Sequence, residues 1–350
     1  MPVYPSSVAN RTSYDPRRVD IRRWRGVTLC LLLITLGAIA SLMLGAKSIA
    51  PETVWMSLTG QLHNADSIII LDARLPRTLA GIIAGIALGG SGALIQALTR
   101  NPLADPGILG VNAGASFAIV MGIIWFGITD MASWLGFAWL GVLVTSVVVW
   151  VIGSLSGGRV NPIRLTLTGV ALSAVLTGIT SSVSLLNPDA FDQMRMWEAG
   201  TLDIRSLHNI ALVAPIVLLG GGLALIIARA LNALSMGDDI ATALGTRTVL
   251  IRSVAVIAIM LMCGSATALV GPIGFVGLMI PHIARWWAGP DQRWIVFYSM
   301  LLAPVLLLCA DILARLLAPS ELRVSIITAF IGAPVLIWLV RRHNIVGNER

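Results

Sequence analysis

The hydrophobic pattern of this chain consists of long apolar stretches separated by short polar segments. Because an α-helix rises ~1.5 Å per residue, about 20 apolar residues cross the hydrocarbon core of a membrane. The stretch 253–284 is too long for one crossing and contains Gly271-Pro272 and Gly274, so we divide it into two tightly reversing elements. The pattern therefore predicts an all-α polytopic membrane protein with ten transmembrane helices. The nine stretches without Asp, Glu, Lys or Arg are 26–46, 78–99, 106–129, 131–158, 165–188, 206–228, 253–284, 294–310 and 324–340.

The basic residues predict how these helices are oriented. Ten crossings return the chain to its starting side, and that side then holds 17 of the 24 Lys and Arg residues. The positive-inside rule places both termini in the cytoplasm. Residues 1–26 are then a cytoplasmic N-terminal arm, 27–342 a ten-helix membrane domain and 343–350 a cytoplasmic tail. The net charge of +7 is a topology signal and does not indicate a nucleic-acid partner.

Composition excludes several classes of protein. The chain is 57% hydrophobic and 12% charged, whereas about a quarter of the residues of a soluble domain are charged. The three cysteines lie in apolar stretches and the four histidines are scattered, so neither a disulfide nor a metal site is expected. A nucleotide-phosphate loop needs Gly directly before Lys, and the only lysine, Lys47, follows Ala46. We therefore expect any ATP hydrolysis to take place on a separate chain. This chain itself is not expected to be an enzyme or to bind a cofactor.

Three arginines lie on the side that the positive-inside rule depletes. Arg74 and Arg77 are three residues apart, which places both guanidinium groups on one face of a helix, and Arg315 closes a later helix. One such arginine alone could be a snorkelling helix-end residue. Together they favour a recognition patch, since guanidinium groups bind carboxylates in bidentate geometry. Asp311, four residues before Arg315, is expected to neutralise and orient it.

The helix that follows Arg77 has the pattern of an interior helix. Its glycines recur every four residues, at Gly81, Gly85 and Gly89. Such a face of small residues allows another helix to approach closely within a membrane. The helix is expected to end before Asn101-Pro102, because the two prolines and the glycine of residues 101–107 prevent its continuation.

A second candidate segment lies between two apolar stretches on the cytoplasmic side. Acidic residues after Gly237 favour the start of a helix, and Gly245 favours its end. The helix between them is short and amphipathic, and a solvated connector and a docking helix remain open alternatives. If it docks, a bulky charged residue at Ala241 is expected to disrupt the docking face.

Two further segments are ambiguous. A break at Gly271–Gly277 lies at membrane depth, which favours structural packing over a role in lining a pathway. The loop before the fifth helix contains Asn161-Pro162-Ile163 between two arginines. A turn is favoured there, and a gate is the alternative.

These segments together resemble the permease subunits of ATP-binding-cassette importers for iron–siderophores and vitamin B12, the FecCD type. The resemblance covers residues 28–342 and, within the family, is to the permeases for ferric enterobactin. The segments that carry it are RLPRTLAGIIAGIALGGSGALIQALTRNPLADPGILGVNAGAS, GDDIATALG, GPIGFVGLMIPHIARW, DILARL with ELRVSIITAFIGAPVLIWLVRR, and, for enterobactin, LLNPDAFDQMRMWEAGTLDIRSLH with SATALVGPIGF.

The resemblance implies a function and a set of partners. The chain would move a ferric siderophore, ferric enterobactin or a similar catecholate, from the periplasm through the bacterial inner membrane to the cytoplasm. It would pair with a second permease, a paralogue rather than an identical copy, and with two cytoplasmic ATPase subunits. A periplasmic siderophore-binding protein would deliver the cargo.

The resemblance also assigns site residues. The arginines with which the family docks its binding protein match Arg74, Arg77 and Arg315. The cytoplasmic gate matches Asn161, Pro162 and Ile163, although the vitamin B12 relative has small hydroxyl residues there. The helix that couples to the ATPase matches Gly237, Asp238, Asp239, Ala241, Leu244 and Gly245.

Two alternatives remain beside this interpretation. An ion-coupled secondary transporter usually carries acids or histidines inside the membrane, whereas Asp311 is the only acid near a span and has Arg315 as a partner. Within the importer class, vitamin B12 or haem is the alternative cargo. A large chelate needs a wide, transient cavity, which accounts for the near absence of charge in the spans.

Overall fold

The computed structural model describes residues 16–154, 162–318 and 322–347, and every regular element in these ranges is helical. The elements are α1 (Pro16–Met43), α2 (Pro51–Leu58), α3 (Ala65–Ile68), the π-helix η1 (Ile69–Arg74), α4 (Leu75–Thr99), the 3-10 turn η2 (Pro106–Leu109), α5 (Val111–Phe126), α6 (Met131–Ser154), α7 (Pro162–Leu186), α8 (Pro188–Glu198), α9 (Leu207–Ser235), α10 (Asp238–Ala243), α11 (Thr248–Ile259), the π-helix η3 (Met260–Gly264), α12 (Ser265–Val270), α13 (Val276–Ala288), α14 (Gln292–Leu317) and α15 (Val324–Gly347).

The predicted class, an all-α polytopic membrane protein, is confirmed for the described residues. Seven helical segments are long and apolar enough to cross a membrane, and α5 and the first part of α15 are shorter apolar helices. The seven segments are Ile21–Met43, Ala65–Thr99, Met131–Ser154, Ile163–Leu186, Leu207–Ser235, Thr248–Val270 and Gln292–Leu317.

The division of the longest apolar stretch is also confirmed. α12 ends at Val270 and α13 begins at Val276, with five non-helical residues between them. Gly271 has φ +74°, which glycine adopts without steric cost. A Cβ atom there would lie 2.4 Å from the carbonyl oxygen of Trp197. This segment is therefore packed against the loop after α8, as the structural interpretation predicted.

Helix α4 lies at the centre of the bundle, where its glycines allow close contact with α14. A Cβ atom on Gly85 would lie 2.5 Å from Pro304, and one on Gly89 would lie 2.1 Å from the carbonyl oxygen of Ser299. The prediction of an interior helix with a small-residue face is thus confirmed. Around α4 also pack α9, α11, α12 and α13.

Some helix boundaries differ from the apolar pattern. α1 begins at Pro16, so the second half of the predicted N-terminal arm is helical. Two helices that the pattern did not predict, α2 and α8, are only 8 and 11 residues long. Both are too short to cross a membrane. A search for apolar stretches of membrane length does not detect such short helices.

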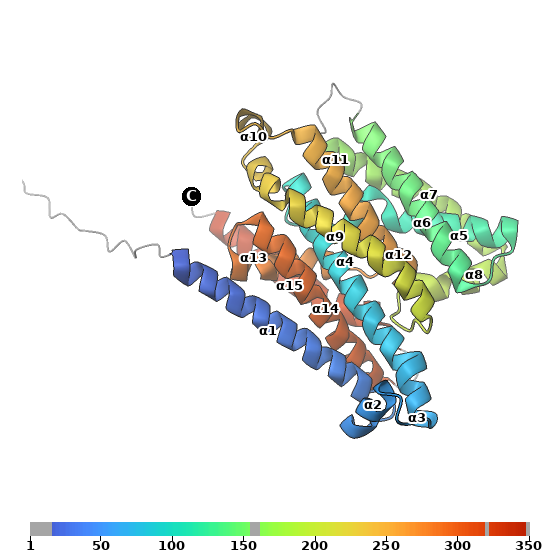
Figure 1. Ribbon diagram of the computed structural model, residues 1–350. Coiled ribbons are helices and arrows are strands. Elements are labelled where there is room, and N and C mark those ends of the chain that lie inside the picture. Colours follow the sequence, from blue (N-terminus) through green and yellow to red (C-terminus); the bar gives the residue numbers. More distant parts are fainter. Residues whose placement is uncertain (1–15, 155–161, 319–321, 348–350) are drawn as a thin grey trace, which may run out of the picture.

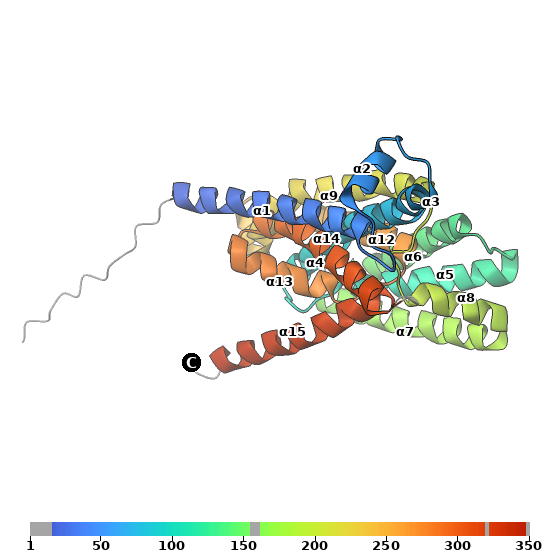
Figure 2. The same ribbon diagram turned by 90° about the horizontal axis from the view of Figure 1, so that it is seen from below.

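The bundle has two distinct ends. The described ends of the chain, at the start of α1 and the end of α15, lie at the same end as α10 (Figure 1). We call this the termini end. Helices α2, α3 and α8 lie at the opposite, distal end. Figure 2 shows α15 diverging from the other helices toward the termini end.

Candidate functional site

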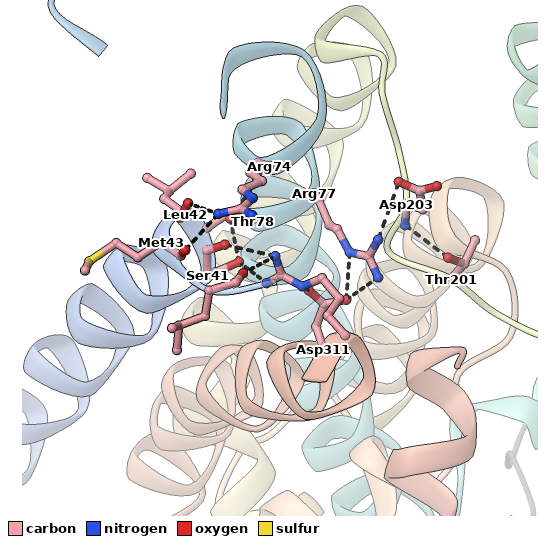
Figure 3. Close-up of polar contacts among 11 residues, drawn as sticks. Ser41, Leu42, Met43, Arg74, Arg77, Thr78, Thr201, Asp203 and Asp311 are labelled. Carbon is pink, nitrogen blue, oxygen red and sulfur yellow. Dashed lines mark hydrogen bonds and ion pairs between the residues drawn. The ribbon is translucent and has the colours of Figure 1, made fainter. Parts of the chain in front are cut away.

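The predicted arginines Arg74, Arg77 and Arg315 lie together at the distal end, but their side chains are largely buried. Figure 3 shows Arg74 directed at the end of α1 and Arg77 at Asp311. Arg74 is only 6% exposed. Its Nη1 donates to the carbonyl oxygens of Leu42 at 2.7 Å and Met43 at 2.9 Å, and its Nη2 donates to the carbonyl of Lys47. The last carbonyl groups of a helix have no partner within the helix. Arg74 supplies that partner for α1 and ties its end to the start of α4.

Asp311 of α14 lies between the other two arginines and is 1% exposed. Arg77 Nε donates to Asp311 Oδ1 at 2.8 Å, and its Nη2 lies 2.8 Å from the same oxygen as an ion pair. Its Nη1 lies 3.5 Å from Asp203 Oδ1. Arg315 Nε lies 3.0 Å from Asp311 Oδ2, as an ion pair without hydrogen-bond geometry. Arg315 Nη2 also donates to Ser41 Oγ at 2.9 Å. One carboxylate therefore balances two guanidinium groups that connect α1, α4 and α14.

This geometry both confirms and extends the sequence prediction. The expected pairing of Arg315 with Asp311 is confirmed. The pairs of Arg77 with Asp311 and Asp203 were missed. Their partners lie 234 and 126 positions away along the chain, so no local pattern indicates them. The only available signal was that Asp311 is the one acid near a span.

A hollow of about 560 Å³ opens beside this cluster. We call it the distal hollow. Its lining is rich in basic residues, with Asp203 as the acidic one. The side chains of Lys47 and Arg205 are 61% and 74% exposed, although Lys47 pairs with Asp66 and Arg205 lies 3.8 Å from Asp203. The basic lining residues are Lys47, Arg74, Arg77, Arg205, Arg315 and Arg323.

At the termini end, α10 is held by its first residue. Asp238 accepts hydrogen bonds from Arg252 Nη2, at 2.7 Å and 2.9 Å, and from Arg100 Nη2. Arg100, whose φ is +53°, ends α4 and also donates from Nε to the carbonyl of Leu234 at 2.8 Å. Burial alone would raise the pKa of Asp238, but the hydrogen bonds and charges of the two arginines outweigh it and lower the pKa. Asp238 thus links α10 to the ends of α4 and α9 and to α11.

The C-terminus of α10 has the predicted glycine stop. Gly245 has φ +79°, and its N–H donates to Thr242 while the N–H of Thr246 donates to Ala241. These two hydrogen bonds form a Schellman motif, which ends a helix at a left-handed residue. The start at Gly237 is confirmed as well, since it is the N-cap residue of α10.

One expectation about α10 is wrong. Ala241, on which a bulky charge was expected to disturb docking, is fully buried within this chain. The outward side chains are Ile240 and Leu244, at 49% and 66% exposure. In a six-residue helix with apolar residues on both faces, the sequence does not distinguish the packed face from the exposed one. Asp239 is also exposed.

The predicted gate is not brought together with either cluster. Asn161 lies outside the described residues, Pro162 begins α7, and Ile163 is 70% exposed. The gate assignment therefore stays a prediction.

Comparison with known proteins identifies the family. The sequence pattern of the FecCD transport family matches residues 31–342. The chain belongs to the FecCD transport family. This FecCD chain is 55% identical, over 93% of its length and 97% of the relative, to the ferric enterobactin transport system permease protein FepD of Escherichia coli strain K12. It is 37% identical to the probable siderophore transport system permease protein YfiZ of Bacillus subtilis strain 168, over 90% of this chain and 96% of the relative.

A solved structure shares the fold of this FecCD family member. It is described as an inward-facing conformation of a metal-chelate type ABC transporter, has 27% sequence identity and superposes with a TM-score of 0.79. The match covers 91% of this chain and 99% of the other. The FecCD chain is thus a transport protein, and the secondary-transporter alternative is not favoured.

Proposed function

We propose that this chain is the permease subunit of an ATP-driven importer that carries a ferric siderophore, ferric enterobactin or a similar catecholate, from the periplasm to the cytoplasm. The observation that carries the proposal is the 55% identity to a ferric enterobactin permease, which extends over 93% of this chain. Other family relatives named for haemin or ferric citrate are at most 36% identical. ATP hydrolysis belongs to a separate chain.

The proposed topology has ten crossings and cytoplasmic termini, within the bacterial inner membrane. Besides the seven long segments, the shorter apolar helices α5 and α15 and the 13-residue α13 would make the other three crossings. In this topology 17 of the 24 Lys and Arg residues, among them Arg22, Arg100, Arg252 and Arg293, fall on the termini side. The other side has seven, and six of them line the distal hollow. This distribution supports a cytoplasmic termini end.

The proposed partners are a second permease, a paralogue rather than an identical copy, two ATPase subunits and a periplasmic siderophore-binding protein. The binding protein docks at the distal hollow, whose basic lining favours carboxylates. Arg74 and Arg315 support this surface from within, since backbone carbonyls and Asp311 already occupy their donors. Lys47 and Arg205 are the exposed positive groups of the hollow.

In the proposed mechanism this chain performs no covalent chemistry. The ATPase subunits seat α10 through Ile240 and Leu244, and their closure moves the helices that Asp238 holds together. Asp238 with Arg100 and Arg252 is called the Asp238 clamp. Helix α4 extends from this clamp to Arg77 at the distal end. Binding-protein docking and ATP binding each favour different arrangements of the permease pair, which alternates access by a population shift.

Uptake of labelled iron tests the function. Deletion of the gene in its native host should abolish uptake of iron presented as ferric enterobactin, while uptake from a ferric hydroxamate, haem and vitamin B12 should continue. Uptake should return with the wild-type gene, fail on ATP depletion and survive a protonophore that leaves ATP intact. Normal ferric enterobactin uptake in the deletion strain, or loss of haem uptake instead, would contradict the assigned cargo.

A charge reversal tests docking at the distal hollow. Lys47→Glu with Arg205→Glu should weaken binding of the loaded binding protein by about tenfold or more, because like charges then oppose its carboxylates. Affinity is measured on the purified transporter at two salt concentrations. Arg195→Glu is the matched control, since Arg195 is 69% exposed at the same end and lies outside the hollow. Equal affinities in both variants and the wild type would place docking elsewhere.

Arg74→Glu is a poor test of the same idea. The sequence interpretation expects Arg74→Glu with Arg77→Glu to abolish uptake while membrane insertion stays normal. Arg74 is buried and binds three carbonyl groups, so its reversal would also disrupt the end of α1. Substitutions of exposed residues of the hollow test docking without disturbing the fold.

A further inference from the structure

A second hollow lies at the termini end, and none of its lining residues belongs to the two clusters described above. It has a volume of about 500 Å³ and lies between α1, α9 and α14. Both α1 and α9 pack against α14. The lining residues are Arg23, Trp24, Leu225, Arg293, Trp294 and Phe297.

The mouth of this hollow combines positive charge with aromatic rings. The guanidinium carbon of Arg23 lies 5.3 Å from the ring centroid of Trp294, and its Nη2 donates to the carbonyl of Ala288 at 3.2 Å. Trp24 contacts Trp294 edge to face, with ring centroids 5.8 Å apart. Residues 16–25 carry five arginines and one aspartate. Arginine thus outnumbers aspartate at the start of α1, and packing holds Arg23 and Trp24 in place.

Arg293 adds a second guanidinium group from the first turn of α14. Asp291 accepts from its Nε and Nη2, the latter at 3.0 Å, while Nη1 donates to no acceptor that the structure describes. The Arg293 side chain is 54% exposed. Asp291 therefore holds the Arg293 guanidinium group in place and leaves Nη1 for another acceptor.

Away from the mouth, exposed apolar side chains continue along α1 and α9. Two helical turns bring a helix back to the same side after seven residues. On this spacing Leu31 follows Trp24 on α1 and Leu218 precedes Leu225 on α9, and all four side chains are at least 40% exposed. No charged residue lies between these positions on either helix after Arg25. Such an exposed apolar face suits contact with an acyl chain.

We propose that this hollow binds an anionic phospholipid, with its phosphate at Arg23 and Arg293 and its acyl chains along the apolar faces of α1 and α9. Tryptophan and arginine mark the membrane–water interface, and basic pockets between helices on the cytoplasmic side bind anionic headgroups. Charge complementarity with the arginine-rich start of α1 selects an anionic lipid over a zwitterionic one.

Photo-crosslinking in a mixed bilayer tests this site. The assembled transporter is placed in nanodiscs with equal amounts of phosphatidylglycerol and phosphatidylcholine of identical acyl chains, and a photoreactive residue replaces Leu225. Crosslinks from this position should favour phosphatidylglycerol. The same replacement of Ile226, which is 77% exposed on the adjacent side of α9, should show no preference.

Charge variants then assign the headgroup contacts. Arg23→Gln and Arg293→Gln should each reduce the phosphatidylglycerol preference at Leu225 by about fivefold, as expected for one basic residue near a membrane surface. Arg23→Lys should retain the preference. Arg25→Gln is the matched control, because two residues along a helix turn a side chain to the opposite side. Should Arg23→Gln fail to fold, the lipid competition in the otherwise wild-type protein still decides the proposal.

Three outcomes would overturn the proposal. Equal crosslinking of both lipids at Leu225 would show bulk bilayer contact only. Crosslinks to a protein chain would identify a subunit interface. A preference for phosphatidylglycerol that Arg25→Gln weakens as much as Arg23→Gln would show a diffuse charge effect without a site.

Discussion

At the residue scale, the decisive feature is one buried carboxylate with two guanidinium partners. Asp311 is 1% exposed, and the side chains of Arg77 and Arg315 are 18% and 12% exposed. Removing one partner from a buried ion pair leaves an uncompensated charge, which costs more than the pair itself contributes. Asp311 is therefore a structural requirement for any docking role of the distal end.

Asp311→Asn keeps the size of the side chain and removes its charge. We expect the free energy of unfolding to fall by about 3–5 kcal/mol, because the two arginines then repel each other where little solvent screens their charges. Thermal unfolding of the solubilised protein measures it. Asp203→Asn is the control: Asp203 is 34% exposed and 3.5 Å from Arg77, so the expected loss is below about 1 kcal/mol. Similar losses in the two variants would contradict this account.

At the scale of elements, close helix contact depends on the absence of side chains at chosen positions. A Cβ atom on Gly92 would lie 2.2 Å from the carbonyl oxygen of Gly277, and one on Gly89 2.1 Å from that of Ser299. Both neighbours are backbone atoms, so relief requires movement of a whole helix. Small residues set the distance of α4 from α13 and α14.

Gly89→Ala should destabilise the bundle by about 1–3 kcal/mol, as overpacking of a filled interior does. Gly222→Ala is the matched control, since Gly222 is also within a helix and a Cβ atom there would meet nothing within 4 Å. That variant should be neutral or gain roughly 0.5–1 kcal/mol from a stiffer unfolded chain. Unfolding temperatures by tryptophan fluorescence compare them. A stable Gly89→Ala protein would show that α4 and α14 pack more loosely.

The sequence predicted elements better than contacts. Apolar length and the Gly-Pro break located the spans and the division before α13, because those signals are local. Whether Ala241 or Leu244 faces the bundle depends on the neighbouring α9 and α11, so the short helix alone did not decide it. For the same reason the pattern placed Arg74 on an outer surface, although α1 covers it.

At the scale of the whole molecule, α4 connects the two candidate surfaces. Its first turns carry Arg77, and Arg100 directly after its last residue binds Asp238 of α10. Asp238 is charged at neutral pH, and its lowered pKa keeps it charged into more acidic conditions. Since the folded pKa is depressed, the stabilisation is present above the ordinary aspartate value of about 3.9 and is lost as pH falls through the lower folded value. The contacts of Asp238 with Arg100 and Arg252 are thus insensitive to pH in the physiological range.

Substitutions on the two faces of α10 separate coupling from folding. Leu244→Glu places a charge on the 66% exposed outward side chain, so the permease pair should assemble and bind the loaded binding protein. The ATPase subunits should dissociate or hydrolyse ATP without transport, because an apolar contact in a cleft does not accept an unpaired charge. Ala241→Glu places the same charge at a fully buried position and should instead lower the amount of folded permease.

Three measurements on each variant distinguish these outcomes: permease level in the membrane, ATPase co-purification and siderophore uptake. Arg341→Gln is the control for charge at the same end, since Arg341 is exposed on α15 and remote from α10 in the chain. It should retain all three. Normal ATPase association and uptake with Leu244→Glu would make α10 a solvated connector. In that case the force of ATP-driven closure would have to reach α4 by another contact at the termini end.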